Sequence, residues 1–150
     1  MASTSYGKVR TIAVIIMIMG AIFTVAGVVT WFAVRSQLAA ENITVSDDAQ
    51  YFSGDKVEGP FTAYAEANVI NDHALAATGG KTYAELAQDD PKRQTAMTAS
   101  FLRASLYTSV VAFGVAALAA VLGILLILLG WALMALAGVP REPAGPVAVS

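Results

Sequence analysis

Two long apolar stretches constrain this chain more than any other feature of its sequence. Thr11–Val34 and Leu106–Val139 are 24 and 34 residues long and contain no Asp, Glu, Lys, Arg or His. A helix of about 20 apolar residues crosses the roughly 30 Å hydrocarbon layer of a membrane. The expected fold is therefore an all-α membrane protein, a two-helix transmembrane hairpin with a small helical extramembrane cap between the spans.

The apolar stretches divide the 150 residues into five parts. A loop domain of about 70 residues has a core of only marginal stability by itself, so we expect it to depend on the spans or on a partner. The first apolar run is too long for the core of a secretory signal, which favours an uncleaved anchor. The expected parts are an N-terminal tail (residues 1–10), a first transmembrane helix (11–34), an acidic helical loop domain (35–105), a second transmembrane helix (106–139) and a disordered C-terminal tail (140–150).

Charge distribution predicts the orientation of the hairpin. Two basic residues, Lys8 and Arg10, precede the first span and one, Arg35, follows it. Basic residues before a first span favour a cytoplasmic N-terminus, and loops longer than about 60 residues translocate with little regard to charge. We expect a location in the cell membrane, with both termini cytoplasmic and the loop extracytoplasmic.

The loop carries a strong negative charge that bears on its partners. Residues 36–102 contain ten acidic and four basic side chains. Such a surface repels nucleic acid, so we expect none as a partner. Membrane lipids and another membrane protein or complex are the expected partners, and a homo-oligomer is also possible.

Local signals predict that the loop is helical. Arg35–Glu41 can extend the first span, and Pro60 suits the first position of a helix that Gly79 ends. The pattern Thr82-Tyr83-Ala84-Glu85 is a capping box and predicts a short helix to about residue 88. No helix breaker follows Pro91 before Gly114, so one helix should run from Lys92 into the membrane.

Apolar spacing predicts which faces of these loop helices meet. The long helix carries an apolar stripe formed by Met97, Phe101 and Ala104. The preceding helix repeats apolar residues at helical spacing and should cover that stripe. The covering residues are expected to be Phe61, Tyr64 and Val69.

Motifs for phosphate or calcium binding have simpler interpretations here. Gly79-Gly80-Lys81-Thr82 resembles the end of a phosphate-binding loop, but Leu75 takes the place of its first glycine and a helix precedes it. The pairs Asp47-Asp48 and Asp89-Asp90 lack the spacing of a calcium loop. A helix end followed by a helix start explains the first motif, and helix-start charge explains the acidic pairs.

The chemistry available to the chain is limited. There is no cysteine, and the single histidine, His73, shares its helix with Glu66 and Asp72 but has no nearby nucleophile in the sequence. Thiolate metal sites are excluded, and a haem or zinc site within one chain is not expected. We predict a protein without catalytic residues, metal or cofactor.

Small residues recur at four-residue spacing in the spans, as in closely packed membrane helices. Their role is either packing within the hairpin or contact with a partner helix. The candidate helix-packing residues are Gly20, Thr24, Ala112, Ala116, Ala119, Ala120 and Gly123.

Several segments together resemble a family of small two-span membrane proteins of actinobacteria. They are Gly59–Ala65, His73–Leu75, Gly79–Leu86, Asp90-Pro91, Arg93–Thr95, Ser100–Arg103 and Ser109–Val115. Members often carry a label that ties them to the small subunit of an aromatic ring-opening dioxygenase. Those enzymes need a metal held by histidine and carboxylate ligands, which one histidine cannot supply. The resemblance therefore implies a topology rather than an activity.

Three functions compete at this point. The first is a non-enzymatic accessory subunit or assembly factor of a larger membrane complex. The second is an extracytoplasmic sensor or ligand-binding module, and the third is a homo-oligomeric channel. For the loop, the candidate interaction surface consists of Phe61, Tyr64, His73 and Tyr83.

Overall fold

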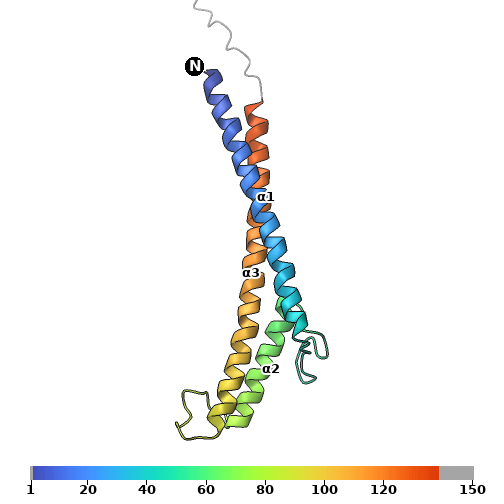
Figure 1. Cartoon of the computed structure of the whole chain (residues 1–150), viewed down its shortest axis with the longest axis vertical. Helices are drawn as coiled ribbons and strands as arrows, with labels where there is room; N and C mark the ends of the chain where they lie inside the picture. The colour runs from blue at the N-terminus through green and yellow to red at the C-terminus, as the bar shows by residue number, and fades with distance from the viewer. Residues whose placement is uncertain (1, 139–150) are drawn as a thin grey trace, which may run out of the picture. The chain divides into compact units, whose positions relative to one another are not determined.

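The computed structural model describes residues 2–138, and these residues form three helices (Figure 1). They are α1 (Ala2–Ala40), α2 (Pro60–Thr78) and α3 (Lys92–Ala137). Within the described residues the one β pairing is an isolated antiparallel bridge between Thr44 and Lys56. The prediction of an all-helical fold is confirmed. The predicted tail, residues 140–150, lies outside the described residues.

Helices α1 and α3 contain the two apolar stretches. Both are long and apolar enough to cross a membrane. Helix α1 continues beyond Val34 to Ala40, and α3 runs without interruption from Lys92 to Ala137, as the lack of helix breakers predicted. The described residues divide into two compact units, one formed by residues 2–25 with 120–138 and the other by Ala26–Ala119. Helices α1 and α3 each contribute to both units, whereas α2 lies within the second.

In the first unit, α1 and α3 are in direct backbone contact. A Cβ atom added to Gly20 would stand 2.6 Å from the carbonyl oxygen of Gly123, and one added to Gly130 would stand 2.7 Å from that of Ala13. The order of these contacts along the two segments shows that they run antiparallel. Glycine is required at these positions because any side chain would separate the helices.

In the second unit, α2 packs beside the first half of α3 and against the end of α1 (Figure 1). Alanines on α2 allow this close packing. The Trp31 ring contacts Phe113 edge-on at 4.7 Å between centroids, and the Tyr107 hydroxyl donates to Asn68 Oδ1 at 2.9 Å. The buried core consists of Leu38, Val45, Val57, Ala63, Ala67, Leu106 and Phe113.

The ends of α2 and the start of α3 follow the predicted signals. The amide of Gly59 donates to Thr62 Oγ1, with Pro60 at the first helical position. Gly79 ends α2 with φ of 72°, a left-handed conformation that favours glycine. Asp90 Oδ1 accepts a 2.8 Å hydrogen bond from the amide of Lys92 and so caps α3.

The short helix predicted after Thr82 is wrong, because residues 81–91 form turns and irregular backbone. The Glu85 carboxylate does reach back to the Thr82 amide at 2.7 Å, as in a capping box. However, the Thr82 hydroxyl donates to that carboxylate instead of accepting from the Glu85 amide. Half of the box is formed, and it closes a turn rather than starting a helix.

The predicted apolar stripe of α3 is wrong in part. Val69 is buried and Met97 is half-buried, but Phe101 is 69% exposed, Ala104 is exposed, and Phe61 on α2 is 74% exposed. The contact between α2 and α3 uses small residues, including the buried Ala63 and Ala96. Close approach through alanines leaves the larger aromatic side chains outside the interface.

The glycine contacts of the first unit give a matched test within α3. Gly123→Ala should lower the free energy of unfolding by about 1–3 kcal/mol, because its Cβ would overlap the Gly20 carbonyl oxygen, 2.5 Å away. Gly114→Ala is the control, since nothing lies within 4 Å of a Cβ there. It should be neutral or stabilising by up to about 1 kcal/mol. Unfolding followed by circular dichroism measures both, and equal effects would contradict the contact.

Candidate functional site

The residues between α1 and α2 form an ordered loop that three polar contacts hold in place. The most buried of them is made by Glu66, which is 7% exposed on α2. Its Oε2 accepts a hydrogen bond from the Ser46 amide at 2.8 Å, and both its oxygens lie 3.2 Å from the Ser46 hydroxyl. Hydrogen bonds to a charged group contribute about 1.5–3 kcal/mol each. Glu66 therefore fixes the loop to α2.

The second contact joins His73 on α2 to Asp48 on the loop. His73 Nε2 lies 2.6 Å from Asp48 Oδ2, and both side chains are more than half exposed. The hydrogen bond to Asp48, assisted by its negative charge, raises the pKa of His73 above its ordinary value. The same bond lowers the pKa of Asp48. The two side chains form an ion pair when the His73 imidazole is protonated, and its raised pKa extends the pH range of this pair upward.

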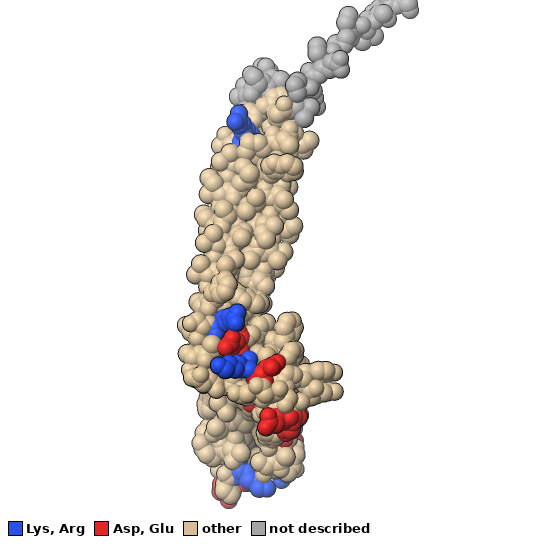
Figure 2. Space-filling model, turned by 90° about the vertical axis from the view of Figure 1, so that its right-hand side faces the viewer, with Lys and Arg blue, Asp and Glu red and all other residues tan. Residues whose placement is uncertain are grey.

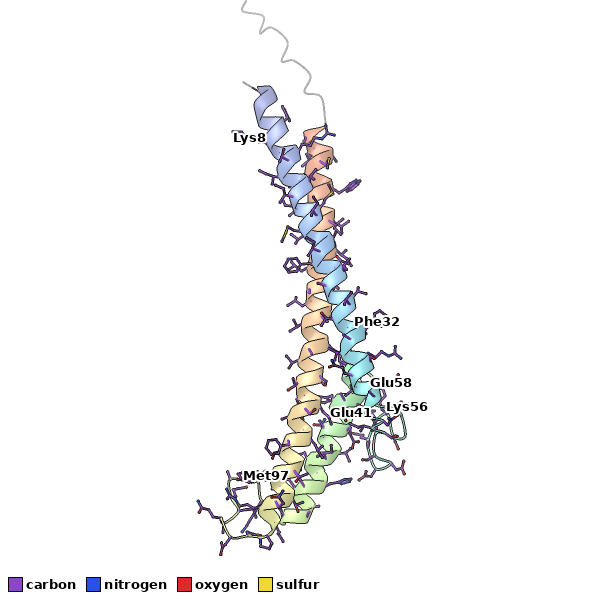
Figure 3. The ribbon with its side chains drawn as sticks, viewed as in Figure 1. Lys8, Phe32, Glu41, Lys56, Glu58 and Met97 are labelled. Carbon is purple, nitrogen blue, oxygen red and sulfur yellow. The ribbon has the colours of Figure 1, made fainter. Side chains whose placement is uncertain are left out.

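The third contact lies at the end of α1. Arg35 donates to Glu58 Oε2 at 3.0 Å, with both side chains substantially exposed. Glu58 and Lys56 lie on the loop beside Glu41 at the C-terminal end of α1 (Figure 3). Exposed pairs of this kind contribute little to stability. The arrangement mainly places opposite charges next to aromatic residues at the end of the apolar stretch.

A groove lies between α2 and α3 in the second unit. Its volume is about 490 Å³, and its walls are mostly apolar with polar side chains at the edges. His73 stands on its edge, so the groove and the ion pair are adjacent. The lining residues are Ile70, His73, Ala74, Ala77, Gln94, Thr95, Thr98, Ala99 and Leu102.

The predicted loop interaction surface is not one continuous patch. Phe61 and Tyr64 lie near the start of α2, where the Tyr64 ring stands 6.0 Å from that of Tyr107. His73 lies three turns further along the helix. Tyr83 lies on the other loop, with the Arg93 guanidinium 4.1 Å above its ring. The structure leaves all four exposed and does not bring them together.

The seven small residues singled out in the spans are all buried or half-buried. Gly20, Thr24 and Gly123 meet within the first unit, and the Thr24 hydroxyl donates to the Gly20 carbonyl at 2.9 Å. Sequence spacing did not single out Gly130 or Ala13, which make an equally close contact. Ala13 lies seven residues before Gly20, and Gly130 lies seven residues after Gly123. This spacing of one heptad is the sequence signal that would have identified the second contact.

The described part of the chain offers no assembled metal site. Among residues 2–138, no three His, Asp or Glu side chains come close enough together to hold a metal ion. Glu66 and Asp48 were not identified from the sequence as partners of Ser46 and His73. Only the fold brings Asp48 to His73, across 25 residues of sequence.

No protein family, characterised protein or solved structure was found to match this chain. The fold and the contacts above therefore stand on their own. The resemblance to the actinobacterial two-span family stays a prediction.

The single histidine gives a direct test of the ion pair. Because folding raises the pKa of His73, the pair contributes fully below about pH 6.5 and is lost as the pH rises through the folded-state pKa. Because folding lowers the pKa of Asp48, the contribution is also lost as the pH falls below about 3.9 through its folded-state pKa. NMR titration of the imidazole should give a pKa above about 6.5.

Two asparagine variants separate the causes of this shift. Asp48→Asn should return the pKa of His73 toward its ordinary value, because it removes both the hydrogen bond and the nearest charge. Asp72→Asn is the matched control and should change the pKa much less, since its charge has the smallest effect. Equal shifts in the two variants would contradict a specific pair.

Proposed function

We propose that this chain is a non-enzymatic integral membrane protein that acts as an accessory subunit or assembly factor of a larger membrane complex. Helices α1 and α3 cross the bilayer, both termini are cytoplasmic, and the acidic loop domain lies outside the cell membrane. The support for membrane insertion is the exposure of the apolar side chains. Only 17% of the most apolar stretch of each helix is buried, whereas a core helix of a soluble protein is mostly buried.

The proposal of a partner protein rests on the position of Gly114. It lies on an exposed face of α3, and a Cβ added there would meet nothing within 4 Å. A glycine inside a helix costs about 0.5–1 kcal/mol relative to alanine. At Gly20 and Gly123 the chain's own helix contact offsets this cost, but at Gly114 no such contact does. Close approach of a helix from another protein would explain a glycine at this position.

A ligand-binding module is the second candidate, and one observation favours it. The groove between α2 and α3 is large enough, at about 490 Å³, for a small molecule and combines apolar walls with polar edges. In that case the loop domain would be the functional part and the helices its anchor. The third candidate, a homo-oligomeric channel, has less support because the apolar stretches contain no Asp, Glu, Lys, Arg or His.

The absence of cysteine makes the topology directly testable. Single substitutions Lys8→Cys and Gln88→Cys introduce one exposed thiol each. In intact cells a membrane-impermeant maleimide should label Gln88→Cys alone, and Lys8→Cys only after permeabilisation. The reverse pattern would invert the orientation. Labelling of both sites in intact cells would contradict two membrane crossings.

Gentle solubilisation from the native membrane tests the partner. The tagged protein should recover a second membrane protein at a fixed ratio, measured by native mass and mass spectrometry. Gly114→Leu should reduce that recovery by about tenfold, which corresponds to about 1.4 kcal/mol of binding free energy. Gly114→Ala should weaken recovery less than Gly114→Leu, because its side chain is smaller. Gly7→Leu is the matched control and should retain the partner, since Gly7 is another exposed helical glycine with nothing within 4 Å of an added Cβ. Recovery of this chain alone would contradict the proposal and favour the ligand-binding module.

A further inference from the structure

Phe52 occupies an unusual conformation in the loop between α1 and α2. Its φ is 61°, in the left-handed region that bulky residues avoid at a cost of about 1–2 kcal/mol. Asn42 and Gly54 also have positive φ, but these residue types adopt it readily. Phe52 is 46% exposed, so its burial within the chain offsets little of the free energy of this strained conformation.

Backbone hydrogen bonds hold this turn in place. The Asp55 amide donates to the Phe52 carbonyl at 2.9 Å, and the amides of Gly54 and Val45 donate to the carbonyls of Val45 and Asp55. Val45 is part of the buried core. Phe52 is thus presented at a fixed position by a turn anchored in the core.

The Phe52 side chain forms one wall of a pocket of about 320 Å³ beside the end of α1. Its other walls combine aromatic rings with charged groups, and basic and acidic side chains lie side by side on this face of the second unit (Figure 2). Two cations and one carboxylate leave a net charge of +1, which suits an anion. The lining residues are Trp31, Arg35, Phe52, Lys56, Glu58, Gly59, Pro60, Phe61 and Thr62.

The pocket also adjoins the apolar stretch. Trp31, in its wall, belongs to the first apolar stretch, and the neighbouring Phe32 is 61% exposed. Charged residues begin immediately beyond, at Arg35. A ligand in this pocket therefore meets cations at one end and a continuous apolar helix surface at the other.

We propose that this pocket binds the phosphate headgroup of a phospholipid from the surrounding bilayer. Arg35 and Lys56 would contact the phosphate, the aromatic rings would surround the glycerol region, and an acyl chain would follow the Phe32 side of α1. Aromatic rings and basic residues are the groups that proteins place at the level of lipid headgroups. The inference rests on the proposed membrane insertion of α1, because Trp31 must lie at the bilayer boundary.

Fluorescence of Trp31 tests the site. The full chain with Trp131→Phe leaves Trp31 as the single tryptophan. In detergent micelles, brominated phosphatidylglycerol added at low mole fraction should quench it with saturation. Arg35→Gln with Lys56→Gln should raise the half-saturating mole fraction by about tenfold. The matched control, Lys81→Gln with Lys92→Gln, removes two exposed lysines outside the pocket and should leave saturation unchanged.

Phe52→Gly separates binding from folding. Glycine adopts the positive φ without strain, so the variant should unfold at the same or a higher temperature. It should nevertheless weaken saturable quenching by several-fold, because one wall of the pocket is lost. Lower stability with unchanged quenching would overturn the proposal, as would equal quenching in the two double variants.

Failure of the site and failure of membrane insertion give different results. In vesicles made entirely of brominated phosphatidylcholine, an inserted α1 should show strong quenching of Trp31 whether or not the pocket binds lipid. Strong quenching in vesicles without saturation in micelles would overturn the pocket alone. No quenching in either would contradict insertion as well.

Discussion

A helix placed in hydrocarbon must satisfy every backbone hydrogen bond internally, and it gains little from apolar contact with a second helix because lipid is equally apolar. Both features are found in the described structure of α1 and α3, the two helices proposed to span the membrane. The helices are long and unbroken, and in the first unit their backbones come into close contact at Gly20 and Gly123, with the Ile127 side chain packed beside Gly20. Because the glycines carry no side chain, the two backbones come close enough for dispersion contacts to stabilise this helix pair.

The second unit depends on ordinary burial supplemented by polar contacts. Its core includes Leu38 from α1 and Phe113 from α3, so the two long helices provide part of the apolar surface that the loop domain buries. This agrees with the expectation that about 70 residues form too small a core alone. The Glu66 carboxylate then fixes the loop to α2 at Ser46, next to the buried Val45.

Elements with strong local signals were predictable from the sequence, and contacts between distant residues were not. The proline and glycine at the ends of α2 gave its bounds, and the lack of breakers gave the length of α3. The buried face of α3 was predicted wrongly in part because apolar spacing favours large residues, whereas Ala96 is buried and Phe101 is 69% exposed. The turn after Thr82 has the sequence of a helix start, but only tertiary structure decides whether a helix follows.

Two residues stand out because the chain's own structure does not explain them. Gly114 lowers helix stability relative to alanine, yet no other described part of the chain lies close to it. Phe52 adopts a strained backbone conformation without full burial of its side chain. In an isolated chain, alanine at the first position and glycine at the second would each be expected to increase stability. Both features are accounted for if the relevant surroundings lie outside the chain, a helix beside Gly114 and a lipid headgroup beside Phe52. The two surroundings are independent, because a protein partner at one position neither requires nor excludes a lipid at the other.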